Sequence, residues 1–314
     1  MKKIVLLITI PFLALGLFAE DTEDLTASSG LLLQVSSLPE VKLGFTQSFK
    51  FPFMQGGNPL TEGNNIRLDL TAEVSPVSLN GLVNAIWTPI AFFELSAGVR
   101  LGTGWTLKLG DNTNIGIGLN LPTAGTEAQY SGNAFDAILC KIHLGGTIQF
   151  DFAALFPGDW NHVVFLSYHE INYHGNTRAQ AGQAWYYEND YGENLNGFNY
   201  YGNLVIGYQM PKKPLFLNMV ALMAEGDLFL YNTPNRHLWG DDMISWHFSG
   251  ILSFEFTDNF GVALVTQLRT RRNFTNFDER IPNSNMYYKY RELDTSNPLR
   301  LEFYRIAALV TYQF

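Results

Sequence analysis

The side chains best suited to catalysis or metal binding occur in two short stretches. "HEINYH" carries His169 and His174, and imidazoles are common zinc ligands. On a strand these two histidines lie on opposite faces, so they converge only if the strand bends. "SWHFS" places His247 two residues from both Ser245 and Ser249 on one strand face, where a serine nucleophile finds a base. The second stretch leaves a hydrolase open as an alternative, while no metal site and no cofactor are indicated.

Charged side chains form a second candidate set. They recur at alternate positions of apolar stretches, and would share the face opposite to the apolar side chains. If the strands close on themselves, this face lines the lumen, where groups of opposite sign neutralise one another. The lumen-lining candidates are Arg67, Glu94, Arg100, Glu255, Arg269 and Arg305. We consider two roles for them, a solvated structural network and the lining of a narrow channel.

An aromatic stretch, "AWYYENDYGENLNGFNYYGN", contains seven aromatic residues, three acids and no basic residue. Tyr and Trp give contact area at low entropic cost and are common at binding surfaces. We expect Trp185, Tyr186, Tyr187 and Tyr191 to be exposed in an outer loop and to contact an extracellular ligand or host macromolecule. Other aromatic residues of this stretch suit the girdle at a membrane interface.

The first residues resemble an export signal. Lys2 and Lys3 precede an apolar run that extends to Phe18 and ends on the small residue Ala19. This pattern predicts a signal peptide over residues 1–19. The remaining chain contains one cysteine, Cys140, so no intramolecular disulfide is available to it.

The amino-acid composition restricts the class of protein to which the exported chain can belong. Aromatic residues make up 14% and charged residues 16% of the sequence, whereas about 25% charged residues is usual for a soluble domain. The net charge is −9 and the pI is near 5.1, which argues against binding to nucleic acid. No apolar run long enough for a transmembrane helix follows the signal. These features together indicate a protein that crosses the membrane with β-strands. Only every second residue of such a strand faces lipid, so no long apolar run is needed.

The final strand carries a family resemblance. Its two alternating faces are Tyr304, Ile306, Ala308, Val310 and Tyr312 towards lipid, and Arg305, Ala307, Leu309, Thr311 and Gln313 towards the lumen. The alternation, with Tyr312 two residues before the terminal Phe314, resembles the C-terminal signal of bacterial outer-membrane β-barrel proteins. The resemblance implies that Tyr312 and Phe314 are an assembly signal recognised by the barrel-assembly machinery. It also implies residence in lipid of the cell outer membrane.

The spacing of strands and turns predicts a closed antiparallel β-barrel of ten strands. The first strand is placed at 38–51, after a short periplasmic segment at 20–37, in a single barrel domain over 20–314. A change of phase at Ser75 and Pro76 is interpreted as a bulge within one strand, because a turn there would make the strand number odd. Twelve strands are the alternative, if segments near 113–119 and 285–292 pair independently.

The predicted function follows from the strand number. Barrels of about eight strands have filled interiors, whereas open channels have about 16 to 18. We therefore expect an outer-membrane protein without enzymatic activity that binds a partner through its aromatic, mildly acidic outer loops. A narrow selective channel for small solutes is the alternative, and a hydrolase is a third.

Overall fold

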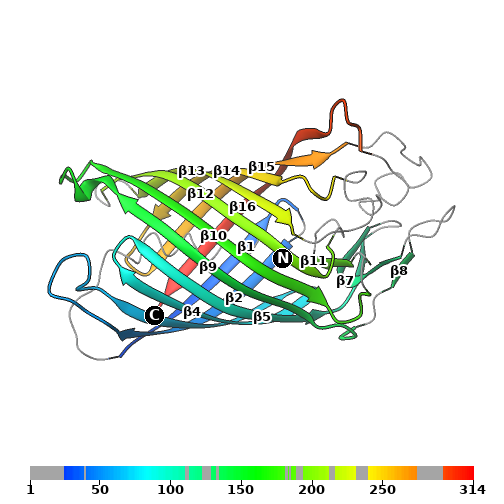
Figure 1. Cartoon of the computed structure of the whole chain (residues 1–314), viewed down its shortest axis with the longest axis horizontal. Helices are drawn as coiled ribbons and strands as arrows, with labels where there is room; N and C mark the ends of the chain where they lie inside the picture. Colours follow the sequence, from blue (N-terminus) through cyan, green and yellow to red (C-terminus); the bar gives the residue numbers. More distant parts are fainter. Residues whose placement is uncertain are drawn as a thin grey trace.

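Alternating apolar and polar residues form twelve strands that close into an antiparallel β-barrel (Figure 1). The computed structural model describes residues 25–38, 40–109, 113–121, 129–131, 134–180, 183, 185–188, 194–211, 216–230, 240–273 and 293–314. In this part of the chain the barrel order is β1-β16-β15-β14-β13-β12-β10-β9-β5-β4-β3-β2. The expected closed all-β barrel is confirmed, with the alternative number of strands. The predicted signal peptide at 1–19 lies outside the described residues.

The strand bounds are as follows. The barrel consists of β1 (Thr26–Ser36), β2 (Glu40–Pro52), β3 (Asn65–Ser75), β4 (Ser78–Ile90), β5 (Phe93–Gly104), β9 (Leu139–Asp151), β10 (His162–Asn176), β12 (Gly197–Gln209), β13 (Leu217–Phe229), β14 (Ser245–Glu255), β15 (Phe260–Arg272) and β16 (Leu299–Gln313). Off the barrel lie β6 (Leu107–Leu109), β7 (Thr113–Leu121), β8 (Gln129–Ser131) and β11 (Trp185–Glu188), and a short 3-10 helix, η1 (Phe152–Ala154), follows β9. None of the described helical segments is long and apolar enough to span a membrane.

The barrel begins earlier in the chain than expected. Strand β1 pairs with β2 and with the final strand β16, so the placement of the first strand at 38–51 is wrong, as is the assignment of 20–37 as a purely periplasmic segment. The seam that closes the barrel pairs Gly30 with Gln313. In β1 the alternation of apolar and polar residues is interrupted, because the inward Leu32 is apolar and packs against the apolar cluster inside the barrel.

The phase change after β3 is a tight hairpin, and the predicted bulge is wrong. Ser75 pairs directly with Ser78 of β4, and their hydroxyl oxygens lie 2.7 Å apart. Pro76 and Val77 form the turn, where the fixed φ of proline and its missing N–H are tolerated. Because β1 adds one strand and the hairpin adds another, the number of strands stays even.

Of the two segments considered for extra strands, the one that the structure describes does not join the barrel. Residues 113–119 belong to β7, which pairs with β6, β8 and β11 in a small sheet off the barrel. Residues 285–292 lie outside the described residues. The two added strands are instead β1 and the second half of the predicted bulged strand.

The two mouths of the barrel differ in the length of their connections. At the left of Figure 1 lie 53–64, 91–92, 152–161 and 256–259, the end of β12 and the start of β13, together with the C-terminus. At the right lie the turn 76–77 and the strand ends that are joined by one further short turn, after β1, and by the longer connections after β5, β10, β13 and β15. Long connections are extracellular in barrels of this kind. We therefore call the right-hand end the outer mouth and the left-hand end the inner mouth.

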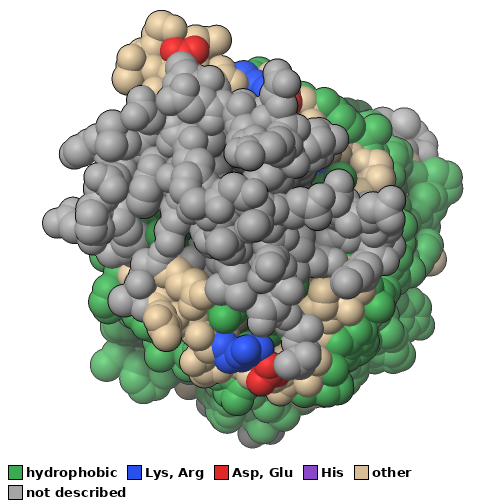
Figure 2. All heavy atoms as spheres, turned by 90° about the vertical axis from the view of Figure 1, so that its right-hand side faces the viewer, with side chains coloured by type: hydrophobic (Ala, Val, Ile, Leu, Met, Phe, Trp, Pro, Cys, Tyr) green, Lys and Arg blue, Asp and Glu red, His purple; other side chains and the backbone are tan. Residues whose placement is uncertain are grey.

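A belt of apolar side chains covers the outside of the barrel. Leu144, Ile206 and Leu222 are 66%, 53% and 71% exposed, and each lies at an outward position of its strand. Figure 2, which looks onto the outer mouth, shows hydrophobic side chains on several sides of the barrel. Exposed aromatic residues lie near both mouths, among them Phe152, Trp160, Phe216 and Phe314 at the inner mouth and Tyr173, Phe198, Trp246 and Phe303 at the outer mouth. Such a surface is suited to contact with lipid, and the fold is that of a transmembrane β-barrel.

A polar cluster interrupts this belt on β10 and β12. Nε2 of His169 lies 2.9 Å from Oγ of Ser167, and Nδ1 lies 2.5 Å from the hydroxyl oxygen of Tyr200. Gly202, the register partner of His169, provides the space, because a Cβ there would lie 2.7 Å from the Tyr200 hydroxyl. The three polar side chains satisfy one another in a region where lipid offers no hydrogen-bond partner.

A bulge in the last strand turns one aromatic residue inward. The register of β15 and β16 shifts next to Gln267, which pairs with Arg305, so that Tyr304 is an additional residue in β16. Tyr304 is 5% exposed, and the guanidinium carbon of Arg269 lies 4.5 Å from the centre of its ring. The expectation that Tyr304 faces lipid is therefore wrong.

Candidate functional site: a folded-in connection at the outer mouth

The long connection between β10 and β12 folds against the barrel at the outer mouth. Its strand β11 pairs with β7, which belongs to the long connection between β5 and β9. The paired ends are Trp185 with Leu119 and Glu188 with Gly116. Figure 1 shows the small sheet at the right-hand end of the barrel. Two connections far apart in the sequence therefore support each other.

The aromatic side chains of β11 are buried, and the expectation that they form an exposed binding surface is wrong. Trp185, Tyr186 and Tyr187 are 0%, 2% and 1% exposed. Trp185 and Tyr187 pack in an apolar cluster with residues of β7 and β9, and the indole Nε1 of Trp185 donates to Oδ1 of Asn196 at 2.9 Å. Removal of this aromatic area from water favours the folded-in position. Tyr191, the fourth predicted binding residue, lies outside the described residues.

Glu188 joins the end of β11 to the barrel wall. Its Oε2 lies 2.8 Å from Nζ of Lys42 on β2, and its Oε1 accepts a hydrogen bond of 2.8 Å from Oγ of Ser78 on β4. The backbone of Glu188 has φ 55°, in the left-handed region. For a residue with a Cβ this conformation costs on the order of 1 kcal/mol or more, and such strain is found preferentially at functional sites.

Tyr187 makes a second attachment to the wall. Its hydroxyl donates to Oδ1 of Asn80 on β4, and Gly102 on β5 leaves room for it, because a Cβ there would lie 3.1 Å from the hydroxyl oxygen. The guanidinium carbon of Arg100 lies 5.9 Å from the centre of the Tyr187 ring. Nη2 of Arg100 also donates to Oε2 of Glu73 at 2.9 Å. The folded-in strand thus contacts β2, β4 and β5.

The charges around β11 determine the protonation states of Glu188 and Tyr187. Burial acts to raise the pKa of the Glu188 carboxyl group, but the positive charges of Lys42 and Arg100 outweigh burial and hold this pKa well below its usual range. Burial, together with the negative charge of Glu188, raises the pKa of the Tyr187 hydroxyl. Glu188 is therefore an anion at neutral pH, and Tyr187 remains a hydrogen-bond donor.

The six predicted lumen-lining residues all lie at inward positions of the barrel strands. Most contact a polar partner on the same or a nearby strand. The contacts are Nε of Arg67 to Oδ2 of Asp69 at 3.3 Å, Oε1 of Glu94 to Oγ1 of Thr88 at 3.4 Å, Arg100 to Glu73 as above, Nε of Arg269 to Oε1 of Glu302 at 2.7 Å, and Nη1 of Arg305 to Oε2 of Glu40 at 2.7 Å. Glu255 lies at the inner-mouth end of β14. Paired charges of both signs therefore line the wall.

Arg305 also bridges the closing seam from the inside. It extends from β16 past β1 to Glu40 on β2, and both side chains are almost completely buried. Its Nε donates to Oε1 of Gln267 at 3.1 Å. Removal of either charged partner from such a pair leaves the other charge buried and uncompensated.

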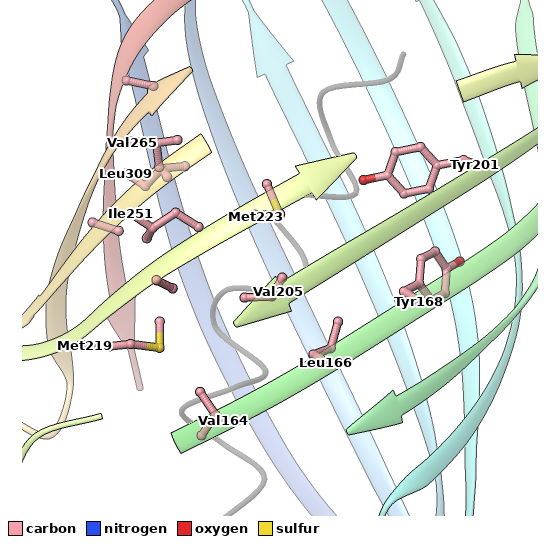
Figure 3. Close-up of a cluster of buried hydrophobic side chains, with 13 residues drawn as sticks. Val164, Leu166, Tyr168, Tyr201, Val205, Met219, Met223, Ile251, Val265 and Leu309 are labelled. Atoms are coloured by element: carbon pink, nitrogen blue, oxygen red, sulfur yellow. The ribbon is translucent and has the colours of Figure 1, made fainter. Parts of the chain in front are cut away.

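A large part of the lumen wall is apolar, which the pattern of charges did not predict. The cluster occupies inward positions of β10 and of β12 to β16 (Figure 3), and consists of Val164, Leu166, Tyr168, Tyr201, Val205, Met219, Ala221, Met223, Ile251, Ala263, Val265, Ala307 and Leu309. In β13 the inward Met219 and Met223 alternate with the outward Val220 and Leu222, so both faces are apolar. The apolar wall could have been inferred from the sequence of β13, because apolar and polar residues do not alternate there.

The residues considered for hydrolysis and metal binding have other environments. His247 packs against Tyr304, with ring centres 5.5 Å apart, and Oγ of Ser249 accepts a hydrogen bond of 3.1 Å from Gln267. His169 faces outward and His174 inward, as strand alternation predicts. Among the residues that the structure describes, no group of three or more His, Cys, Asp or Glu side chains is arranged to hold a metal ion.

Comparison with known proteins supplies no closer identification. No protein-family model and no curated protein sequence matches this chain. Solved structures with a similar fold include the KdgM porin, with 10% identity and a TM-score of 0.36 over 92% of this chain and 98% of that one. They also include the NanC porin, with 6% identity and a TM-score of 0.38 over 92% and 99% of the two chains. OmpT of Vibrio cholerae has 7% identity and a TM-score of 0.36 over 94% and 99%. Likenesses this distant say nothing about what passes through or binds to this barrel.

Proposed function

We propose that this protein is a narrow channel for small solutes across the outer membrane. The observation that carries the proposal is the attachment of β11 inside the outer mouth, by Glu188 to Lys42 and Ser78. A connection held against the barrel wall occupies part of the entrance, so this strand would set the width of the proposed passage.

The burial of the aromatic side chains favours this function over binding through the outer loops. Trp185, Tyr186 and Tyr187 are not available to an extracellular partner in this conformation. Twelve strands also enclose a wider interior than the ten that were expected, between the filled barrels of about eight strands and the open channels of about 16. Both features support a restricted passage.

The paired charges of the wall bear on selectivity. Arg67 with Asp69, Arg100 with Glu73 and Arg305 with Glu40 each combine the two signs. Oppositely charged neighbours cancel much of each other's field, so we expect weak discrimination between small cations and anions. Selection then depends on size and on contacts with the wall.

Conductance of the purified protein in planar bilayers tests the proposal. The wild-type barrel is expected to give small, discrete current steps, and Glu188→Gln is expected to give larger ones, because the neutral side chain no longer pairs with Lys42. Glu62→Gln is the matched control, since Glu62 is exposed in the connection at the inner mouth. Bilayers that stay silent with correctly folded wild-type and Glu188→Gln protein would rule the channel out.

A further inference from the structure

The polar cluster of Ser167, His169 and Tyr200 lies on the outer surface of the barrel, midway between the two mouths. Three register steps across the strands lead from His169 to Trp87, near the inner-mouth end of β4. Three steps in the other direction lead to Trp246, near the outer-mouth end of β14. Aromatic side chains at these two levels suit the girdles that flank the hydrocarbon region. The cluster therefore faces the middle of that region, where water is not available.

The three side chains of the cluster carry one hydrogen more than they use among themselves. A neutral imidazole has one N–H, and the two hydroxyl groups supply two further hydrogens. In the described part of the chain these side-chain atoms make two contacts, from Nε2 of His169 to Oγ of Ser167 and from Nδ1 to the hydroxyl oxygen of Tyr200. Whichever nitrogen carries the hydrogen donates it, and the hydroxyl group that accepts it keeps a hydrogen of its own. One hydroxyl hydrogen and several oxygen lone pairs are thus available to a partner.

A histidine between a serine and a tyrosine is also the arrangement of a base between a nucleophile and an orienting group. Hydrolysis requires a water molecule at the acyl group, and the hydrocarbon region supplies none. A partner that exchanges hydrogen bonds with the cluster therefore matches its position better than a substrate does.

The outer surface around His169 is flat, because a glycine lies on each side of this residue. His169 is paired with Gly146 on β9 and with Gly202 on β12, and these strands lie side by side (Figure 1). The hydroxyl group of Tyr200 occupies the space above Gly202, and a Cβ at Gly146 would find its nearest atom at 3.6 Å. Small residues on a membrane-facing surface let a second protein surface approach closely, and polar side chains there form hydrogen bonds across the contact.

We propose that two copies of this protein associate through this face, with β9, β10 and β12 of one copy against the same strands of the other. A two-fold axis beside His169 brings the spare hydroxyl hydrogen of each cluster to a hydroxyl oxygen of the other. The exposed side chains of Ile148, Ile171 and Leu204 surround the two clusters and pack against the partner. Acyl chains offer neither donors nor acceptors, so the second copy is the complementary occupant. Association of this kind does not depend on whether the barrel conducts.

Sedimentation equilibrium in detergent micelles tests the association. The wild-type barrel is expected to sediment as a dimer. The triple variant Ser167→Ala, His169→Leu and Tyr200→Phe is expected to weaken the dimer on the order of a hundredfold, which corresponds to about tenfold for each of the two hydrogen bonds. Tyr208→Phe is the matched control and should leave the dimer intact, because the Tyr208 hydroxyl donates to the backbone oxygen of Trp160 in its own chain at 2.8 Å. A folded wild-type barrel that is monomeric, or a folded triple variant that dimerises as tightly as the wild type, would overturn the proposal.

Cross-linking of single thiols locates the contact without changing the cluster. In a Cys140→Ala background, Gly146→Cys places a thiol next to His169. Leu33→Cys places one at an exposed outward position of β1, six strands from β10 in either direction around the barrel. A short bis-maleimide added to vesicles that contain the protein is expected to join Gly146→Cys into covalent dimers and to leave Leu33→Cys monomeric. Any other pattern of cross-links would place the contact elsewhere or exclude it, and would overturn the proposal.

Discussion

Glu188 and Lys42, which are 146 residues apart in the sequence, form a buried ion pair of 2.8 Å that attaches the connection between β10 and β12 to the barrel wall. The pair exists only in the closed barrel with β11 folded in. The pair is compatible with the folded-in position of β11 only when both partners are present, because one buried charge without the other strongly destabilises that position. Predictions about the outer mouth follow from this dependence.

Reversal of the pair tests whether the contact itself holds β11. Lys42→Glu alone places two carboxylates together and is expected to release the connection, which makes residues 183–196 accessible to protease in folded barrels. Lys42→Glu combined with Glu188→Lys is expected to restore protection in part. If the single variant stays as resistant to protease as the wild type, the ion pair does not hold the connection.

Acid is expected to release the same connection. The folded-state pKa of Glu188 lies below its usual value of 4.5, so the stabilisation that its charge provides is present above about that pH and is lost as the pH falls through the lower, folded value. Conductance should therefore stay constant between neutral pH and pH 5 and rise only on stronger acidification. Glu188→Gln should lack this acid-dependent increase, and an identical increase in that variant would assign the transition to another group.

Gly102 is predicted to be essential for the docking of Tyr187. A Cβ at this position would lie 3.1 Å from the Tyr187 hydroxyl and closer still to Oδ1 of Asn80. Gly102→Val is therefore expected to displace Tyr187 and widen the entrance, with a larger conductance than the wild type. Gly81→Val on the neighbouring strand is the control, because a Cβ there has open space around it. Equal conductance for the two variants would contradict the role given to Gly102.

The lipid-facing cluster of Ser167, His169 and Tyr200 leads to a prediction about stability. His169→Leu removes the partner of two hydroxyl groups that face lipid, and we expect a loss of about 1 to 3 kcal/mol in the free energy of unfolding. The triple variant Ser167→Ala, His169→Leu and Tyr200→Phe removes all the polar groups and should be more stable than the single variant. Urea unfolding in detergent micelles measures both. A triple variant less stable than His169→Leu would mean that the cluster contributes more than mutual satisfaction of its polar groups.

Tyr312 and Phe314 test the proposed assembly signal. Their rings are in contact at the inner mouth, with centres 5.0 Å apart. Phe314→Ala is expected to reduce the amount of protein assembled in the outer membrane of living cells while the purified chain still folds in detergent. Phe303→Ala removes a similar lipid-facing ring far from the end of the chain and should assemble normally. If both variants assemble equally well, Phe314 is not part of a recognition signal.

Strand alternation was sufficient to predict the closed barrel but not its first strand. Residues such as Val99, Arg100 and Leu101 on β5 show their two faces directly in the sequence. In β1 the inward Leu32 contacts an apolar wall, so the face that should be polar is not, and the strand was missed.

The position of the aromatic connection was not predictable from its composition. The side chains of Trp185 and Tyr187 suit an exposed binding surface and a buried cluster equally well. What decides between the two is the set of partners on the barrel wall, Lys42, Ser78 and Asn80, which lie more than a hundred residues away. A single sequence contains no signal for such contacts.

The pairing of β1 with β16 imposes an order of events on biogenesis. The strand pairing that extends from Gly30 with Gln313 to Ser36 with Ala307 joins the two ends of the described barrel, so the sheet keeps two open edges until both ends have met. A sheet with open edges has unpaired amide groups that lipid does not satisfy. The last step of folding is therefore also the step at which the protein first becomes compatible with its membrane, and a chain interrupted before β16 has no partly functional form available to it.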